Sequence, residues 1–395
     1  MNENRPQIGI VARYFPPTIG GVQTHIIQTS SILEKRDYKL RFFTCQTGKA
    51  EIDDQYNVVR YKKRNKLIDI PSLTRALFNF VSDCDIVHVH SVSGQLSTLT
   101  EIVSNASKTP VVLTAHGTGI VNHPEYRITK RFWHKTTRWA TLKYSDAFIS
   151  TCPHFTDVAL RHIDRNVISE IPEGVDAQFF TPGEANKDTL TNLVGIKPNA
   201  NIILSVNMIK PVKGMQYVIQ VLPSILSSQP NTHYVVIGDG DYKSKLEEIA
   251  DDLDVQANVH FPGATMDEKR IRSYFREADV AVVPSSGEST SISALEALAT
   301  ECPLVASPVG GLKNLIGENE RGRIAEIFPP SSYQRSAPST LPDQKISALA
   351  EELSWVLSNQ DEAKQLAKKG RKHVVENYSW PVIVDQIEDI YQKLL

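Results

Sequence analysis

PSSGESTSISALEALATECPLVASPVGG, residues 284–311, is the stretch of this chain that decides the fold. It follows a valine-rich run and contains two glutamates eight residues apart, Glu288 and Glu296. The pattern predicts a strand, a serine-rich turn, a short Ala/Leu helix, a second short strand and a Gly-Gly turn. Glu288 is then expected on the loop before the helix and Glu296 about one turn inside it.

The start of that helix is suited to a phosphate or diphosphate. Its first backbone N–H groups lack partners within the helix, and the positive end of the helix dipole lies there. A carboxylate can accept hydrogen bonds from two neighbouring hydroxyls, such as those of a ribose. The spacing alone also fits an ordinary helix with glutamate on its solvent-facing side. The choice between this interpretation and a ligand site therefore depends on the rest of the sequence.

Length and composition bound the class of protein. A chain of 395 residues predicts two domains, and 41% hydrophobic with 22% charged residues is typical of a globular protein. No apolar run is long enough to span a bilayer, and MNENRPQ is not a signal peptide. The four cysteines are scattered without a C-x-x-C pair, so neither a disulfide framework nor a zinc-cysteine site is indicated. We expect a cytoplasmic protein.

The charge is divided unevenly along the chain. Residues 1–180 carry 22 Lys and Arg against 17 Asp and Glu, whereas the remainder carries 21 against 28. The first half therefore favours anionic partners, although the excess does not by itself indicate nucleic acid.

Strand-like and helix-like segments alternate throughout, which is typical of an α/β chain with parallel sheets. Expected strands are 7–12, 40–45, 85–90, 110–116, 147–151, 201–207, 233–240, 258–263, 278–284 and 302–307. We predict two Rossmann-like, doubly wound domains, 1–180 and 181–376. They would enclose a cleft at the carboxyl ends of their strands. A last helix, 377–395, opens after Ser379 with Pro381 in its first turn and is expected to pack back on the N-terminal domain.

Several motifs together resemble the retaining glycosyltransferases of family 4, whose two Rossmann-like domains form the GT-B fold. The resemblance covers essentially the whole chain, and the order of the motifs at strand ends makes it specific. The motifs are YFPPTIGGVQTH (14–25), DIVHVH (85–90), TAHGTG (114–119), IPEGVD (171–176), VKG (212–214), VIGDG (236–240) and the glutamate pair followed by PVGG (308–311).

The resemblance implies an enzyme that moves a sugar from a UDP- or GDP-sugar to an acceptor hydroxyl with retention, without a metal or other cofactor. It implies that domain 1–180 binds the acceptor and domain 181–376 the nucleotide sugar. It implies that Glu288 holds the donor sugar, His116 lies beside it, and Lys213 stabilises the charge of the diphosphate leaving group. Glu296 would hold the ribose diol. The donor-binding residues that it implies are Gly20, Gly21, Lys213, Gly238, Gly263, Ser291, Ile292, Ser293 and Glu296.

The glycine pair has a physical basis, and position 208 departs from the family. Gly20 and Gly21 follow the first strand, where glycine lets the backbone approach a donor or acceptor closely, or simply forms a tight turn. The family usually has an arginine five residues before the lysine, where this chain has Met208. Lys210 is a candidate substitute, although lysine and arginine differ in reach and geometry.

Two short patterns suggest a metal. His88 and His90 alternate on one strand and so point to one face, but no third ligand of suitable spacing is visible in the sequence. We expect a structural or acceptor-side role for them. Asp239-Gly240-Asp241 spells D-x-D, which the resemblance interprets as a strand-end turn near the nucleotide rather than a metal site.

A basic segment indicates the acceptor side. RITKRFWHKTTRWATLK, residues 127–143, has six Lys and Arg and no acid, and a second basic run occupies 60–66. Arg127, Arg131, His134 and Arg138 are expected on one helical stripe, with the aromatic side chains elsewhere. We predict a glycan acceptor that is lipid-linked or otherwise anionic, reached by peripheral contact with the inner membrane face. The alternative is a solvated helix whose aromatic residues pack in the core.

Two rival functions remain compatible with the sequence. One is a sugar-nucleotide 2-epimerase of the same fold, which would act on the donor alone. The other is a degenerate transferase that binds a nucleotide sugar without turning it over, which the methionine at position 208 favours.

Overall fold

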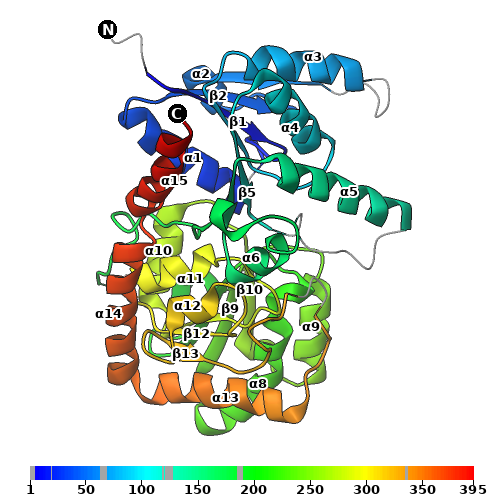
Figure 1. The fold of residues 1–395 in the computed structure, drawn as a ribbon. Coiled ribbons are helices and arrows are strands. Elements are labelled where there is room, and N and C mark those ends of the chain that lie inside the picture. The colour runs from blue at the N-terminus through cyan, green and yellow to red at the C-terminus, as the bar shows by residue number, and fades with distance from the viewer. Residues whose placement is uncertain are drawn as a thin grey trace. The chain divides into compact units, whose positions relative to one another are not determined.

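The computed structural model describes residues 5–18, 20–62, 69–117, 120, 128–184, 190–333 and 337–395, without the side chains of 128–131. The chain divides into two compact units (Figure 1). Unit 1 comprises Met1–Glu173 and Trp380–Leu395, and unit 2 comprises Gly174–Ser379.

Unit 1 is built on a seven-stranded parallel sheet in the order β3-β2-β1-β4-β5-β6-β7. The order reverses between β1 and β4, and ligands bind at such switch points in open α/β sheets. The strands are β1 (Gln7–Ala12), β2 (Lys39–Thr44), β3 (Asn57–Arg60), β4 (Ile86–Val89), β5 (Val111–Ala115), β6 (Ala147–Ser150) and β7 (Ile168–Glu170).

The helices of unit 1 join consecutive strands, as parallel pairing requires. They are α1 (Gly21–Lys35), α2 (Ile52–Gln55), α3 (Ile70–Val81), α4 (Gln95–Ser107), α5 (Ile128–Tyr144) and α6 (Pro153–Ala159), with the 3₁₀ turn η1 (Arg165–Val167). The C-terminal helix α15 (Trp380–Leu394) also belongs to this unit and packs against α1. Its Trp380, Ile383, Ile387 and Tyr391 are buried in one core with β1 and β2.

Unit 2 repeats the plan with a six-stranded parallel sheet in the order β10-β9-β8-β11-β12-β13. Its strands are β8 (Asn201–Val206), β9 (Thr232–Ile237), β10 (Val259–Gly263), β11 (Val280–Val283), β12 (Leu304–Ala306) and β13 (Arg323–Ile324). All residues of β11 and β12 are buried, which is why these strands consist of continuous Val, Leu and Ala.

The helices of unit 2 connect and cover that sheet. They are α7 (Leu190–Val194), α8 (Met215–Ser228), α9 (Lys243–Asp252), α10 (Glu268–Glu277), α11 (Ile292–Ala299), α12 (Leu312–Ile316), α13 (Asp343–Ser358) and α14 (Gln360–Asn377), with the 3₁₀ turns η2 (Pro211–Lys213) and η3 (Gln256–Asn258).

The structure confirms the predicted alternation and the doubly wound parallel sheets. The ten predicted strands are present, and α15 begins directly after Ser379 as expected. The prediction missed β3, β7 and β13, which are short strands at or near the sheet edges. In the described part of the chain, no helix is both long and apolar enough to cross a membrane.

Candidate functional site

Lys213 and Glu288 meet in unit 2 although they are far apart in sequence. The Nζ atom of Lys213 lies 2.7 Å from Oε1 of Glu288, and Ser285 Oγ donates to the same oxygen at 3.0 Å. The two side chains are 16% and 8% exposed. A cation and a carboxylate are therefore held together on the loops that follow β8 and β11.

Backbone packing fixes the positions of these two residues. Gly214, with a φ of 74°, follows Lys213 directly, and a Cβ there would lie 2.0 Å from the carbonyl oxygen of Pro284. Gly310, with a φ of 57°, lies equally close to the chain, because its Cβ would be 1.9 Å from the carbonyl oxygen of Glu288. The backbone N–H of Ser286 also donates to Val212 at 2.9 Å. Both turns need glycine because they combine a left-handed φ with direct backbone contact.

The predicted phosphate-binding helix is α11, and it begins where the sequence suggested. Ser291 is its N-cap, and its Oγ accepts from the N–H of Ala294 at 3.4 Å. The N–H groups of Ile292 and Ser293 belong to the first helical turn, which has no acceptor within the helix. Both residues are half-buried, and the N-terminus of a helix is in general a position that favours anions.

Glu296 lies one turn further along α11 and is half-buried. Burial, with a contribution from the nearby carboxylate of Glu268, raises the pKa of Glu296 to about 8. A carboxyl group with such a pKa is mostly protonated near neutrality. A ligand whose hydroxyls hydrogen-bond to the ionised carboxylate would therefore cause Glu296 to release its proton.

The glycines predicted at strand ends have different surroundings. A Cβ at Gly238 would lie 1.9 Å from the carbonyl oxygen of Asn207, so this glycine lets the ends of β8 and β9 approach. Gly263 has a φ of 98° with open space around it, and its carbonyl accepts from Gly238 at 3.1 Å. In the D-x-D sequence, Asp239 Oδ1 accepts from the N–H of Gly240, which is a turn contact.

The position of the missing arginine is open to solvent. Met208 follows β8 and is 57% exposed, and Lys210 is exposed as well. Because Met208 is exposed, packing in the core does not explain the methionine at this position.

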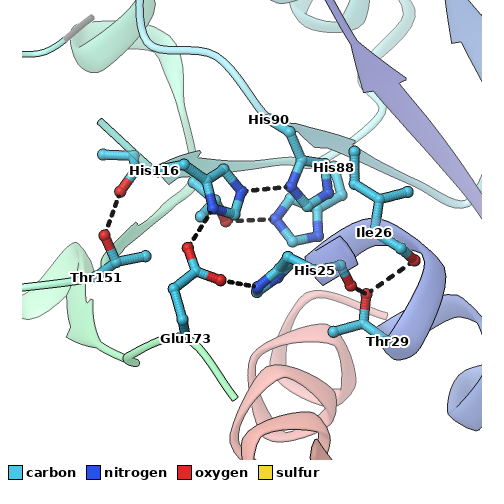
Figure 2. Close-up of polar contacts among 10 residues, drawn as sticks. His25, Ile26, Thr29, His88, His90, His116, Thr151 and Glu173 are labelled. Carbon is cyan, nitrogen blue, oxygen red and sulfur yellow. Dashed lines mark hydrogen bonds and ion pairs between the residues drawn. The ribbon is translucent and has the colours of Figure 1, made fainter. Parts of the chain in front are cut away.

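In unit 1 the structure places His116 in a cluster that the sequence only partly indicated (Figure 2). His116 follows β5, and its Nδ1 lies 2.7 Å from Oε1 of Glu173. The other oxygen of Glu173 lies 2.7 Å from Nδ1 of His25, a residue of α1. Burial alone would raise the pKa of Glu173, but its pairing with His25 and His116 holds that pKa well below the usual range.

His88 and His90 join the same network. Nδ1 of His90 lies 2.8 Å from Nε2 of His116, and the rings of His88 and His90 stack with centroids 4.1 Å apart. His88 bonds Tyr391 and Thr114 at 2.6 Å each. Burial lowers the pKa of His88, His90 and His116 and so favours neutral imidazoles.

The sequence did not single out His25 or Glu173 as site residues. Both stood inside quoted motifs, GGVQTH and IPEGVD, but their side chains had no visible link to the strand-end histidines. The signal was one polar residue after each of three strands of the same sheet, β4, β5 and β7, together with a histidine inside α1. It becomes informative only once the strand order is known.

Gly20 and Gly21 lie at the start of α1, where the turn was predicted. Gly20 is the N-cap of α1, with an extended φ of 163°, and its carbonyl accepts from Thr24 at 3.0 Å. Their contact with a donor or acceptor stays a prediction of the resemblance.

Helix α5 exposes its aromatic side chains. Phe132, Trp133 and Trp139 are 69%, 53% and 46% exposed. A core role for these aromatic residues is therefore excluded. Arg138, one of the residues expected on the basic stripe, is buried and donates to the carbonyl of Ile120. The side chains of Arg127 and Arg131 lie outside the described residues.

Two sheets of this topology define the GT-B class, and comparison with known proteins identifies the family. The family model described as Glycosyltransferase Family 4 matches residues 19–179, and the one described as Glycosyl transferases group 1 matches residues 186–373. The chain therefore belongs to the family 4 glycosyltransferases.

Individual relatives match almost the full length. A D-inositol 3-phosphate glycosyltransferase of Corynebacterium urealyticum is 24% identical, over 95% of this chain and 91% of that protein. A GDP-mannose-dependent monoacylated alpha-(1-6)-phosphatidylinositol monomannoside mannosyltransferase of Corynebacterium glutamicum is 22% identical, over 97% of each. Anabaena HepE in complex with UDP has the same fold, with a TM-score of 0.81 over 98% of this chain and 100% of that chain at 15% identity.

Gly310→Ala tests the backbone contact beneath Glu288. The added Cβ should displace the Glu288 carbonyl and lower the free energy of unfolding by about 3 kcal/mol, more than a left-handed alanine alone costs. Gly195→Ala is the matched control, because Gly195 has a φ of 72° with open space around it. Chemical denaturation of both variants measures the difference, and equal losses would show that the contact is unimportant.

Proposed function

We propose that the protein is a retaining glycosyltransferase that moves a hexose-type sugar from a UDP- or GDP-sugar to an acceptor hydroxyl. The observation that carries the proposal is the Lys213–Glu288 pair, whose glutamate lies on the loop before α11, with Glu296 one turn along that helix. The relatives that match the whole chain are named as glycosyltransferases, one of them dependent on GDP-mannose. In this proposal unit 2 binds the donor and unit 1 the acceptor.

The leaving group is the nucleoside diphosphate, and its charge grows as the bond to the anomeric carbon breaks. Lys213 and the first N–H groups of α11, from Ile292 and Ser293, are the groups that stabilise this charge. They supply positive potential without a metal, and in this proposal the transfer step needs none.

Retention follows from displacement on one face of the sugar. The bond between the anomeric carbon and the diphosphate oxygen breaks, and the acceptor oxygen bonds to the same face of that carbon. The acceptor proton passes to the departing phosphate oxygen, so no side chain has to act as nucleophile. His116, at the end of β5, is proposed to hydrogen-bond a donor-sugar hydroxyl.

Glu288 is proposed to orient the donor sugar rather than to attack it. Its Oε1 is already occupied by Lys213 and Ser285, whereas no described residue donates to Oε2. That oxygen can accept from a sugar hydroxyl, and the Lys213 contact holds the carboxyl group in one orientation.

The acceptor is proposed to be lipid-linked or anionic. Helix α5 exposes Phe132, Trp133 and Trp139, and Lys143 lies 4.9 Å above the ring of Trp139. Exposed aromatic rings with cations beside them suit the boundary between lipid headgroups and acyl chains. One full-length relative is named for a phosphatidylinositol mannoside acceptor.

Glu296→Gln tests the ribose assignment. A ribose diol should select the ionised carboxylate, so donor binding at pH 7 should release a proton and strengthen as the pH rises toward 8. Glu296→Gln should abolish the proton release and weaken binding about tenfold or more, as for hydrogen bonds to a charged group. Calorimetry with a nucleotide sugar in buffers of different ionisation enthalpy measures both quantities.

Glu268→Gln is the control for that experiment. Removing the neighbouring charge should lower the pKa of Glu296 and reduce proton release at pH 7, without loss of affinity. Unchanged affinity in Glu296→Gln would remove Glu296 from the nucleotide site.

Glu288→Gln tests catalysis itself. Because Glu288 orients the sugar, this variant should lower turnover about 100-fold while nucleotide affinity stays near that of the wild type. A thermal-shift screen of UDP-, GDP- and ADP-sugars identifies the nucleotide sugar that binds. The rate is then measured as transfer of its sugar to an acceptor, or as slow hydrolysis of the nucleotide sugar. Glu318→Gln, an exposed glutamate of the same unit, should leave the rate unchanged.

The same assay separates the rivals. An epimerised nucleotide sugar formed without acceptor would identify a 2-epimerase. Donor binding without any turnover in the wild type would identify a degenerate, non-catalytic protein, which the exposed Met208 in place of arginine favours.

Sedimentation with anionic phospholipid vesicles at low salt tests the membrane proposal. The wild type should pellet with the vesicles, and Trp133→Ala combined with Trp139→Ala should stay in the supernatant. Phe78→Ala removes an aromatic side chain of α3 with similar exposure, 49%, and should still pellet. A wild type that remains unbound contradicts the proposal.

A further inference from the structure

Three histidines and a carboxylate gather inside unit 1, and we call His25, His90, His116 and Glu173 the histidine cluster. They come from α1, from the ends of β4 and β5, and from the segment that follows β7 (Figure 2). The side chains of His25, His116 and Glu173 are 1%, 4% and 5% exposed, and His90 is buried as well. A polar group this deeply buried needs a defined partner for each of its hydrogen-bonding atoms.

Glu173 decides where the imidazole protons lie. Its two oxygens accept from Nδ1 of His116 and Nδ1 of His25, each at 2.7 Å. Each ring then carries a hydrogen on Nδ1, and Nε2 is the nitrogen left to present a lone pair. A carboxylate that orients a ring through Nδ1 while Nε2 faces inward is the usual arrangement behind a metal-binding histidine.

One of these lone pairs has no partner. Nε2 of His25 is fully buried, and no described group bonds it. An unsatisfied buried nitrogen costs about 1–3 kcal/mol, so this atom calls for an ion or a water that completes it.

The ligand atoms converge. Histidines 25, 90 and 116 each offer one ring nitrogen, and these nitrogens all lie within 4.8 Å of one another. Nitrogens around a tetrahedral zinc ion, with Zn–N bonds of 2.0–2.1 Å, lie about 3.4 Å apart. Nδ1 of His90 and Nε2 of His116, now 2.8 Å apart, would have to separate slightly to admit the ion.

We propose that the histidine cluster is a transition-metal site of the zinc type, with His25, His90 and His116 as ligands and Glu173 as the residue that orients two of them. Imidazole nitrogens prefer Zn²⁺, Co²⁺, Ni²⁺ or Cu²⁺ over Mg²⁺ and Ca²⁺, which prefer oxygen ligands. Three protein ligands leave the fourth position to a water or a hydroxyl. The ion joins α1 to the ends of β4 and β5.

His88 supports the site without being a ligand. Both of its ring nitrogens are bonded, to Tyr391 and to Thr114, and its ring stacks on His90. This packing fixes the plane of the His90 ring, which is the ligand without a carboxylate partner. Lys213 and α11 belong to unit 2 and are not part of this site. His116 is common to both proposals, and an ion on its Nε2 takes the nitrogen that a donor-sugar hydroxyl would need. The sugar contact proposed for His116 therefore belongs to the metal-free protein.

Titration of the chelator-treated full-length protein with Co²⁺ and Zn²⁺ tests the site. We expect one Co²⁺ per chain with the intense visible absorption of a four-coordinate ion, displaced by one equivalent of Zn²⁺. Zn²⁺ should also raise the midpoint of thermal unfolding in proportion to the logarithm of its concentration above Kd.

Two variants report on different parts of the site. His25→Gln removes a ligand and should abolish the visible absorption and the thermal shift. Glu173→Gln keeps the shape, but its amide N–H₂ must face one Nδ1, which forces that ring to carry its proton on Nε2. Binding should then weaken about 10–100-fold, as for other groups that orient metal ligands.

The pair His233 and His260 provides the matched control. Nδ1 of His233 and Nε2 of His260 lie 3.0 Å apart in unit 2, and the described residues place no third ligand beside them. His233→Ala should leave the Co²⁺ absorption and the thermal shift unchanged. Circular dichroism confirms that each variant is folded. Wild-type protein without saturable binding, or binding that folded His25→Gln and Glu173→Gln both retain, would overturn the proposal.

Discussion

Unit 2 depends on two places where backbone touches backbone without room for a side chain. The carbonyl oxygens of Pro284 and Glu288 lie against Gly214 and Gly310, each in the left-handed region. Through these contacts, the turn after η2 and the PVGG turn both pack against the segment from Pro284 to Glu288. Lys213 precedes the first of these glycines, so the cation and the carboxylate meet as a consequence of backbone packing. A long side chain fixed in this way loses less entropy when the ligand arrives.

The fold, and the local structure around Glu288 and Glu296, were predictable because their signals are local. Strand composition, the Ser-rich turn and the helix after it occur within one stretch, and α11 begins at the expected cap. The edge strand β13 was missed because two residues carry no periodic pattern. The burial of Arg138 was missed because its partner, the carbonyl of Ile120, comes from a distant turn that helical periodicity does not see.

The histidine cluster could not be predicted for a different reason. Its members become neighbours only through the strand order, which places β4 beside β1 and β5 beside β4. His88 and His90 gave a partial signal by alternation, but His25 comes from a helix on another part of the chain. Periodicity identifies the face on which a residue lies, whereas a ligand set requires knowledge of which elements share an edge.

Burial of Glu173 at the centre of that cluster requires a reason. A charged carboxylate removed from water costs several kcal/mol, and pairing with histidine often only balances that cost, so such a pair is weak support for stability. An apolar residue would pack the same space at lower cost. What the carboxylate does, and an apolar residue cannot, is to fix both His25 and His116 with Nδ1 protonated. The buried charge therefore points to a site that uses the opposite nitrogens, the pair that a bound ion would share.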